Sequence, residues 1–67
     1  MTVRLKSMTY DPLRGVYEGR VDVTRDGITY RYPARVCGPA GAPRDWIAAA
    51  LAEAALRQSD SGRLRPR

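Results

Sequence analysis

Apolar and polar residues alternate between positions 16 and 36, on both sides of Asp26 and Gly27. A period of two is typical of strands that bury one face. Asp-Gly is a strong marker of a two-residue hairpin turn, because a type I′ turn requires positive φ at both central residues. The pattern therefore predicts two antiparallel strands joined by a tight turn at Asp26 and Gly27.

A two-residue loop fixes the register of this hairpin by counting outward from the turn. One face then carries apolar or small residues in four facing pairs: Val23 with Tyr30, Val21 with Tyr32, Gly19 with Ala34, and Tyr17 with Val36. The other face carries favourable polar pairs: Asp22 with Arg31, Glu18 with Arg35, and Thr24 with Thr29. A slip of one residue would exchange the two faces, so both patterns support the same register.

Pro33 lies inside the second strand of the hairpin, although proline has no N–H for a ladder. In the predicted register it faces Arg20 in a pair without hydrogen bonds, so its nitrogen points away from the neighbouring strand. A further strand is disfavoured on that side. We therefore expect this strand to be an edge of the sheet.

A first strand is predicted over residues 2–10, with turn residues at 11–15 leading into the second strand. A five-residue loop places Leu5 opposite Val21, Val3 opposite Val23 and Arg4 opposite Asp22. The predicted order of the three strands along the sheet is therefore one, two, three.

The end of this first strand has two interpretations. In a regular strand Ser7 and Thr9 point toward the core, while Met8 and Tyr10 gather with Val16 outside as an apolar cluster suited to a protein contact. A bulge near Ser7 would instead turn Met8 and Tyr10 into the core. Both alternatives are compatible with the sequence.

A helix is predicted from Pro43, which suits a first helical position, to about Arg57 or Ser59. One stripe at helical spacing, with Trp46 beside it, is expected to cover the apolar sheet face: Ile47, Ala50, Leu51 and Ala54. The opposite side is also poor in polar residues: Ala48, Ala49, Ala52 and Leu56. Either the helix makes a second packing contact, with Ala49, Ala52 and Leu56 at its centre, or these alanines are present because alanine is the best helix former.

The elements together predict an α+β fold, in which a three-stranded antiparallel meander is followed by one C-terminal helix packed on one face. A single domain is expected over residues 1–58, with a flexible basic tail over residues 59–67. This order of elements resembles the DNA-binding domains of plant ethylene-response factors and the arm-binding domains of phage-type integrases. The resemblance, one of topology, implies that the exposed sheet face reads the major groove.

Charge adds a second observation. Twelve Lys and Arg residues against seven Asp and Glu residues give the 67-residue chain a formal charge of +5, which favours acidic partners. Basic residues predominate on the outward sheet face over Glu18 and Asp22: Arg4, Lys6, Arg20, Arg31 and Arg35. Two interpretations are open: an ordinary solvated face with cross-strand ion pairs, or a face that meets phosphate groups.

The composition carries no catalytic, metal or cofactor signature, because the chain has no His and a single Cys. The glycines at 38 and 41 lack the following Lys and Ser or Thr of a phosphate-binding loop. Cys37 has no base of the usual kind, so it is expected to be a small residue at a strand end rather than a nucleophile. Glu18 and Asp22 are expected to be solvated ion-pair partners rather than an acid and base pair.

Size and cysteine usage bear on partners and location. A chain this short has one marginal core, and neither a disulfide nor a zinc site can reinforce it. The leading hypothesis is therefore a non-catalytic interaction module that self-associates through the helix, since Pro33 handicaps the strand edge. The alternative is nucleic-acid binding through the basic sheet face and tail. A lone thiol and the lack of a long apolar run predict a cytoplasmic protein without membrane association.

Overall fold

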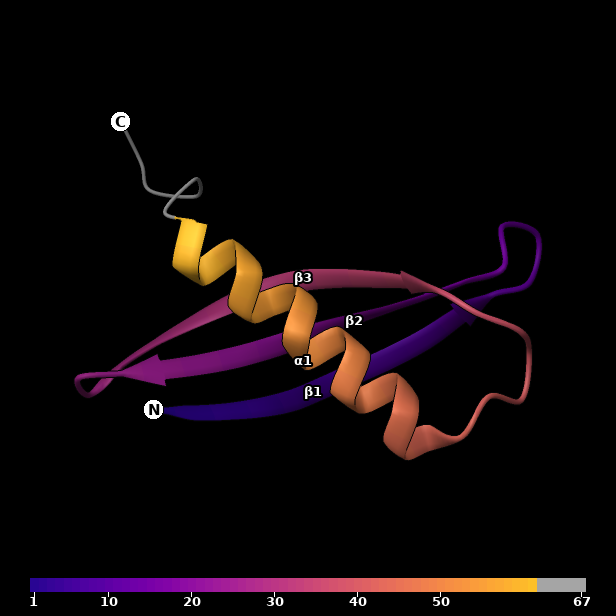
Figure 1. Ribbon diagram of the computed structural model, residues 1–67. Helices are drawn as coiled ribbons and strands as arrows, with labels where there is room; N and C mark the ends of the chain where they lie inside the picture. Colours follow the sequence, from indigo (N-terminus) through magenta and orange to yellow (C-terminus); the bar gives the residue numbers. More distant parts are fainter. Residues whose placement is uncertain (62–67) are drawn as a thin grey trace.

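The computed structural model describes residues 1–61 of the chain. Three strands are followed by one helix: β1 (Thr2–Asp11), β2 (Val16–Arg25), β3 (Ile28–Cys37) and α1 (Arg44–Ser61). The strands form one antiparallel sheet in the order β1-β2-β3, and α1 crosses one face of it diagonally (Figure 1). The predicted α+β fold is confirmed.

The β2–β3 hairpin has the predicted turn and register. Asp26 and Gly27 have φ values of 53° and 77°, as a type I′ turn requires. All the predicted pairs form, from Arg25 opposite Ile28 to Tyr17 opposite Val36, and Pro33 faces Arg20. Turn chemistry and alternation therefore specify this half of the sheet completely.

A β-bulge interrupts the pairing of β1 with β2 between Leu5 and Ser7. Before the bulge the pairs are as predicted, and after it Met8 faces Gly19 and Tyr10 faces Tyr17. Met8 and Tyr10 are both half-buried against the core, and the rings of Tyr10 and Tyr17 lie 4.5 Å apart. The bulge alternative is confirmed.

The alternative prediction, an apolar cluster of Met8, Tyr10 and Val16 on the outward face, is therefore wrong. Met8 and Tyr10 are turned inward, and Val16 is itself buried. The connection between β1 and β2 also has four residues, 12–15, instead of five. The extra residue is taken up in the bulge, which is why the pairs near Leu5 come out the same.

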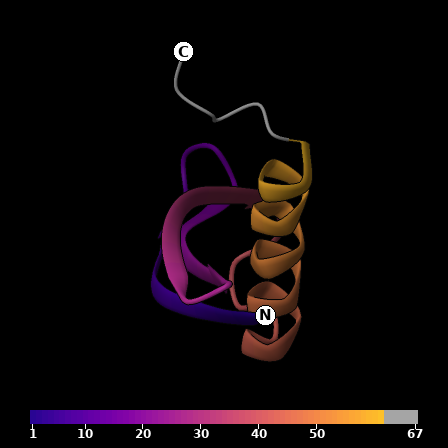
Figure 2. The ribbon, with the colours of Figure 1, turned by 90° about the vertical axis from the view of Figure 1, so that its left-hand side faces the viewer.

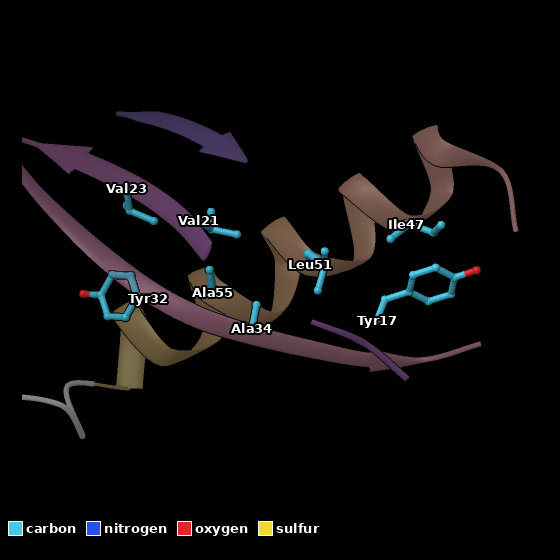
Figure 3. Packing of buried hydrophobic residues seen from close by; sticks show 8 residues of the cluster. All are labelled: Tyr17, Val21, Val23, Tyr32, Ala34, Ile47, Leu51 and Ala55. Carbon is cyan, nitrogen blue, oxygen red and sulfur yellow. The ribbon is translucent and has the colours of Figure 1, made fainter. Parts of the chain in front are cut away.

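The core lies between the sheet and α1 (Figure 3). The helix contributes Ile47, Leu51 and Ala55, which are four residues apart and buried. They pack on buried side chains of β2 and β3: Tyr17, Val21, Val23, Tyr32 and Ala34. The predicted stripe is correct at Ile47 and Leu51, and Ala54 also packs against the core as a half-buried residue. Ala50 is only half-buried and Trp46 is exposed, whereas Ala55, which the stripe left out, is fully buried. A spacing of four is the ridge along which helices commonly pack.

The end of α1 corrects the predicted boundary. The helix begins at Arg44, directly after Pro43, but continues to Ser61 instead of ending at Arg57 or Ser59. Asp60 pairs with Arg25 at the end of β2, so the last turn is attached to the sheet. The domain boundary at residue 58 is therefore three residues too early for the helix, and the rest of the predicted tail, 62–67, lies outside the described residues.

Two tyrosines hold the connection between β3 and α1. The hydroxyl of Tyr17 donates to the carbonyl of Pro39 at 2.6 Å and accepts from the amide of Ala42 at 3.3 Å. The hydroxyl of Tyr10 donates to the carbonyl of Gly38 at 3.4 Å. These bonds set the start of the helix, which lies along the open side of the curved sheet (Figure 2).

Candidate nucleic-acid interface

The sheet face opposite α1, called the outer face below, holds the predicted basic residues. Alternation along the strands brings four of them to this face, Arg4, Arg20, Arg31 and Arg35, and Lys6 in the bulge adds its charge beside Asp22. All five are exposed. Register places them in rows across the sheet. Arg4 faces Asp22, which faces Arg31, and in a neighbouring row Ser7 faces Arg20, which faces Pro33.

Two of these arginines form cross-strand ion pairs. Arg31 binds Asp22 through both carboxylate oxygens, with Nε to Oδ1 at 2.8 Å and Nη2 to Oδ2 at 3.3 Å. Arg35 Nη2 lies 3.1 Å from Glu18 Oε2. The predicted ion pairs are confirmed, and each carboxylate has an arginine as its partner.

The pKa of Asp22 reflects the positive charge of the outer face. The hydrogen bond from Arg31 lowers the pKa of its carboxyl group below the ordinary value of 3.8. Partial desolvation opposes this shift, whereas the charges of Arg31, Lys6 and Arg4 add to it. Three cations therefore act on a single carboxylate, which places Asp22 in a surplus of positive charge.

This shift makes stability depend on pH in a defined direction. Because folding lowers the pKa of Asp22, its contribution is complete above about 3.8 and is lost as pH falls through the lower, folded value. We expect Asp22→Asn to destabilise the protein at neutral pH and to have a diminishing effect in acid, as measured by urea denaturation.

The partner residue supplies the control for this prediction. In an Arg31→Gln background, Asp22→Asn should cost less at neutral pH, because the main source of the lowered pKa is gone. A stability difference between wild type and Asp22→Asn that stays constant down to strongly acidic pH would contradict the assignment.

Besides the two ion pairs, the outer face carries basic side chains that form no salt bridge with another described residue. Within residues 1–61, Arg4, Lys6 and Arg20 form no salt bridge. Five basic and two acidic side chains give this face a formal charge of +3. The other described side chains comprise four basic and five acidic residues, a charge of −1. The described surplus is therefore confined to one face.

The β-bulge adds hydroxyl groups to this face. After the bulge, Ser7 and Thr9 pair with Arg20 and Glu18 and belong to the outer face instead of the core. An open hollow of about 650 Å³ is lined by residues of all three strands and reaches α1 beside β3, with Ser7, Thr9, Arg20 and Arg35 among its walls. Sequence reasoning missed both hydroxyls as site residues, although the bulge alternative contained the signal.

The helix surface predicted to mediate self-association is smaller than the sequence indicates. Ala49 is exposed and Ala52 is half-buried, but Leu56 packs against the core. The next two exposed positions after Ala49 along the helix are Glu53 and Arg57, whose Oε2 and Nη1 atoms lie 3.8 Å apart as an ion pair. The structure therefore separates Leu56 from the other two residues.

The other residues singled out from the sequence are the thiol of Cys37 and the glycine that follows it. Cys37 is an exposed free thiol at the end of β3, and the amide of Gly38 is bonded to the carbonyl of Gly15. In the described part of the chain, no three His, Cys, Asp or Glu side chains are grouped as metal ligands would be. Within residues 1–61, no helix has the length and apolar character needed to cross a membrane.

The three antiparallel strands and single C-terminal helix are the order of elements on which the resemblance to plant ethylene-response factors and phage-type integrases rests. No family model, no curated protein and no solved structure matches this chain.

Proposed function

We propose that this protein is a non-catalytic nucleic-acid-binding module that contacts phosphate groups through its outer face. The observation that carries the proposal is the separation of charge, with +3 on the outer face and −1 on the other described side chains. Arg, Lys, Ser and Thr are among the side chains that contact phosphates in such complexes. All four types are present on this face.

The dimensions of the sheet also fit a nucleic-acid duplex. Three strands about 4.8 Å apart span about 10 Å between the outer two, and the major groove of B-DNA is about 12 Å wide. Proteins of several classes insert β-strands into a groove in this way. Arg4 and Lys6 on β1 and Arg20 on β2 would then meet the phosphates, because none of the three forms a salt bridge with another residue of the described range 1–61.

The test compares two variants of equal net charge. The first replaces Arg4, Lys6 and Arg20 by Gln on the outer face, and the matched control replaces Arg14, Arg44 and Arg57 by Gln elsewhere. Binding to a labelled DNA duplex is measured from about 50 mM to 200 mM salt. In the first variant we expect the slope of log K against log salt to fall by about 2 to 3, at about 0.9 per lost phosphate contact.

The control should retain nearly all of the slope, because its arginines lie outside the outer face. Equal losses in the two variants would show that net charge alone drives binding and would contradict the proposed interface. A wild-type protein that fails to bind duplex at about 50 mM salt would overturn the function itself. Circular dichroism of each variant is the check that its helix and sheet are retained.

We further propose a cytoplasmic setting and no cofactor. The support for the setting is the exposed thiol of Cys37, which has no partner cysteine in the sequence and is best maintained in a reducing compartment. Self-association through Ala49 and Ala52 receives less support than phosphate binding, since polar residues flank the exposed alanine.

A further inference from the structure

Within residues 1–61, the first half of β3 is an open strand edge. β3 lies at one side of the sheet, and its residues 28–31 are all exposed. Arg25 and Ile28 form the hydrogen-bonded pair next to the turn, and such pairs alternate along an antiparallel ladder. The peptide groups of Thr29 and Arg31 therefore point away from β2. An unpaired edge of this kind is a template for another strand.

Apolar side chains accompany this edge. Ile28 and Tyr30 are 54% and 53% exposed, although alternation places them on the side of the sheet that α1 covers elsewhere. The hairpin end extends past the helix (Figure 1), which explains their exposure. The ring of Tyr30 lies 6.4 Å from that of Tyr32, so an apolar strip follows the open peptide groups.

The open edge has a defined length. Pro33 has no N–H, and its carbonyl oxygen accepts a hydrogen bond from Gln58 Nε2 of α1 at 2.6 Å. Pairing along β3 therefore stops at Tyr32 in one direction and at the turn residue Gly27 in the other. Protection of a strand edge by proline and by a helix is common, but here it covers only the second half of the strand.

We propose that this edge pairs with the same edge of a second copy of the chain. The open segment, 28–32, is centred on Tyr30, so an antiparallel pairing about a two-fold axis at Tyr30 uses the whole segment in both copies. The same surface then serves both subunits, as in most symmetric dimers. Thr29 faces Arg31 across the axis, and these are the residues whose peptide groups are available.

Side-chain chemistry is compatible with this pairing. Ile28 faces Tyr32 and Tyr30 faces Tyr30, which joins the two apolar strips. Arg31 faces Thr29, so identical charges are not directly opposed, and each Arg31 keeps its ion pair with Asp22. The Pro33 of each chain lies opposite Gly27 of the other, where the pairing ends.

The resulting dimer has one continuous six-stranded sheet with two outer faces side by side. A five-residue edge buries much less than the 1,200 to 2,000 Å² typical of stable complexes, so we expect a dissociation constant of about 10 µM to 1 mM. This inference does not depend on the proposed nucleic-acid binding.

The test is the mass of the full chain in solution as a function of concentration. Sedimentation from about 10 µM to 1 mM should show the 7.5 kDa monomer converting to a species of twice that mass. Tyr30→Lys places two like charges at the two-fold axis and should remain monomeric throughout. The matched control is Leu13→Lys, which adds the same charge at a 96% exposed apolar residue and should dimerise like the wild type.

Amide hydrogen exchange identifies the surface. In the dimer, protection of the Thr29 and Arg31 amides should increase with concentration, because those groups become paired. A wild-type protein that stays monomeric up to about 1 mM overturns the proposal. Dimerisation that Tyr30→Lys does not weaken, or that protects helix amides without Thr29 and Arg31, also overturns it.

Discussion

Gly19→Ala should destabilise the protein by about 3 kcal/mol, since forcing extra atoms into a packed site typically costs about 1 to 3 kcal/mol and a backbone clash adds to this. A Cβ on Gly19 would lie 2.5 Å from the carbonyl oxygen of Ser7, and 3.1 and 3.2 Å from the Cδ1 atoms of Leu51 and Leu5. The leucine methyl groups can adjust, whereas the Ser7 carbonyl is fixed in the bulge. Urea denaturation measures the loss as a shift in midpoint.

The bulge provides the control for this substitution. Deleting Lys6, the residue that the pairing passes over, should restore a regular β1 while keeping Leu5 and Met8 inward. If the Ser7 carbonyl causes the clash, Gly19→Ala will cost less in the deletion background than in the wild type. A cost below about 0.5 kcal/mol in the wild-type background, as for an ordinary surface substitution, would show that the close approach is absent.

Leu51→Ala is expected to have an effect of similar size for a different reason. Leu51 is fully buried at the centre of the helix face that meets the sheet, and truncation of such a leucine costs about 2 to 5 kcal/mol. Proteins are stable by about 0.05 to 0.15 kcal/mol per residue, which for this chain is only about 3 to 10 kcal/mol. The variant should therefore unfold far below the wild-type melting temperature, as circular dichroism would record.

Leu13→Ala is the matched control for that prediction, because Leu13 is 96% exposed in the β1–β2 connection. The same truncation there should change stability by less than about 0.5 kcal/mol. Similar losses at the two leucines would contradict the assignment of Leu51 to the core.

The hairpin could be predicted from sequence because two independent signals agree on it. Asp26 and Gly27 fix the loop length, and alternation fixes which face is buried. For β1, loop length and alternation did not together fix one register. A five-residue loop without a bulge and a four-residue loop with one give the same partner for Leu5, so the two differ only after Leu5.

The helix face was harder to predict because alanine carries little information about burial. Ala54 and Ala55 are equally good helix formers, and the diagonal crossing of α1 over the sheet decides that Ala55 is the buried one. The same crossing draws Leu56 toward the core and reduces the surface around Ala49. A crossing angle depends on packing between distant elements, which a local sequence pattern does not contain.

Most of the candidate interface followed from the register. The ion pairs of Asp22 with Arg31 and of Glu18 with Arg35 were both predictable once the turn was placed. The contributions of Ser7 and Thr9 were not, because their direction depends on the bulge. The hollow near Arg20 could not be predicted for the same reason.

Alternation along the strands has an evolutionary consequence. Val3 and Leu5 face inward while their neighbours Arg4 and Lys6 face the solvent, so adjacent codons serve separate purposes. Substitutions at the outward positions can change the chemistry of the outer face without disturbing the core, whereas the inward positions are constrained by packing. The same scaffold is therefore a natural starting point for libraries in which only every second residue is varied.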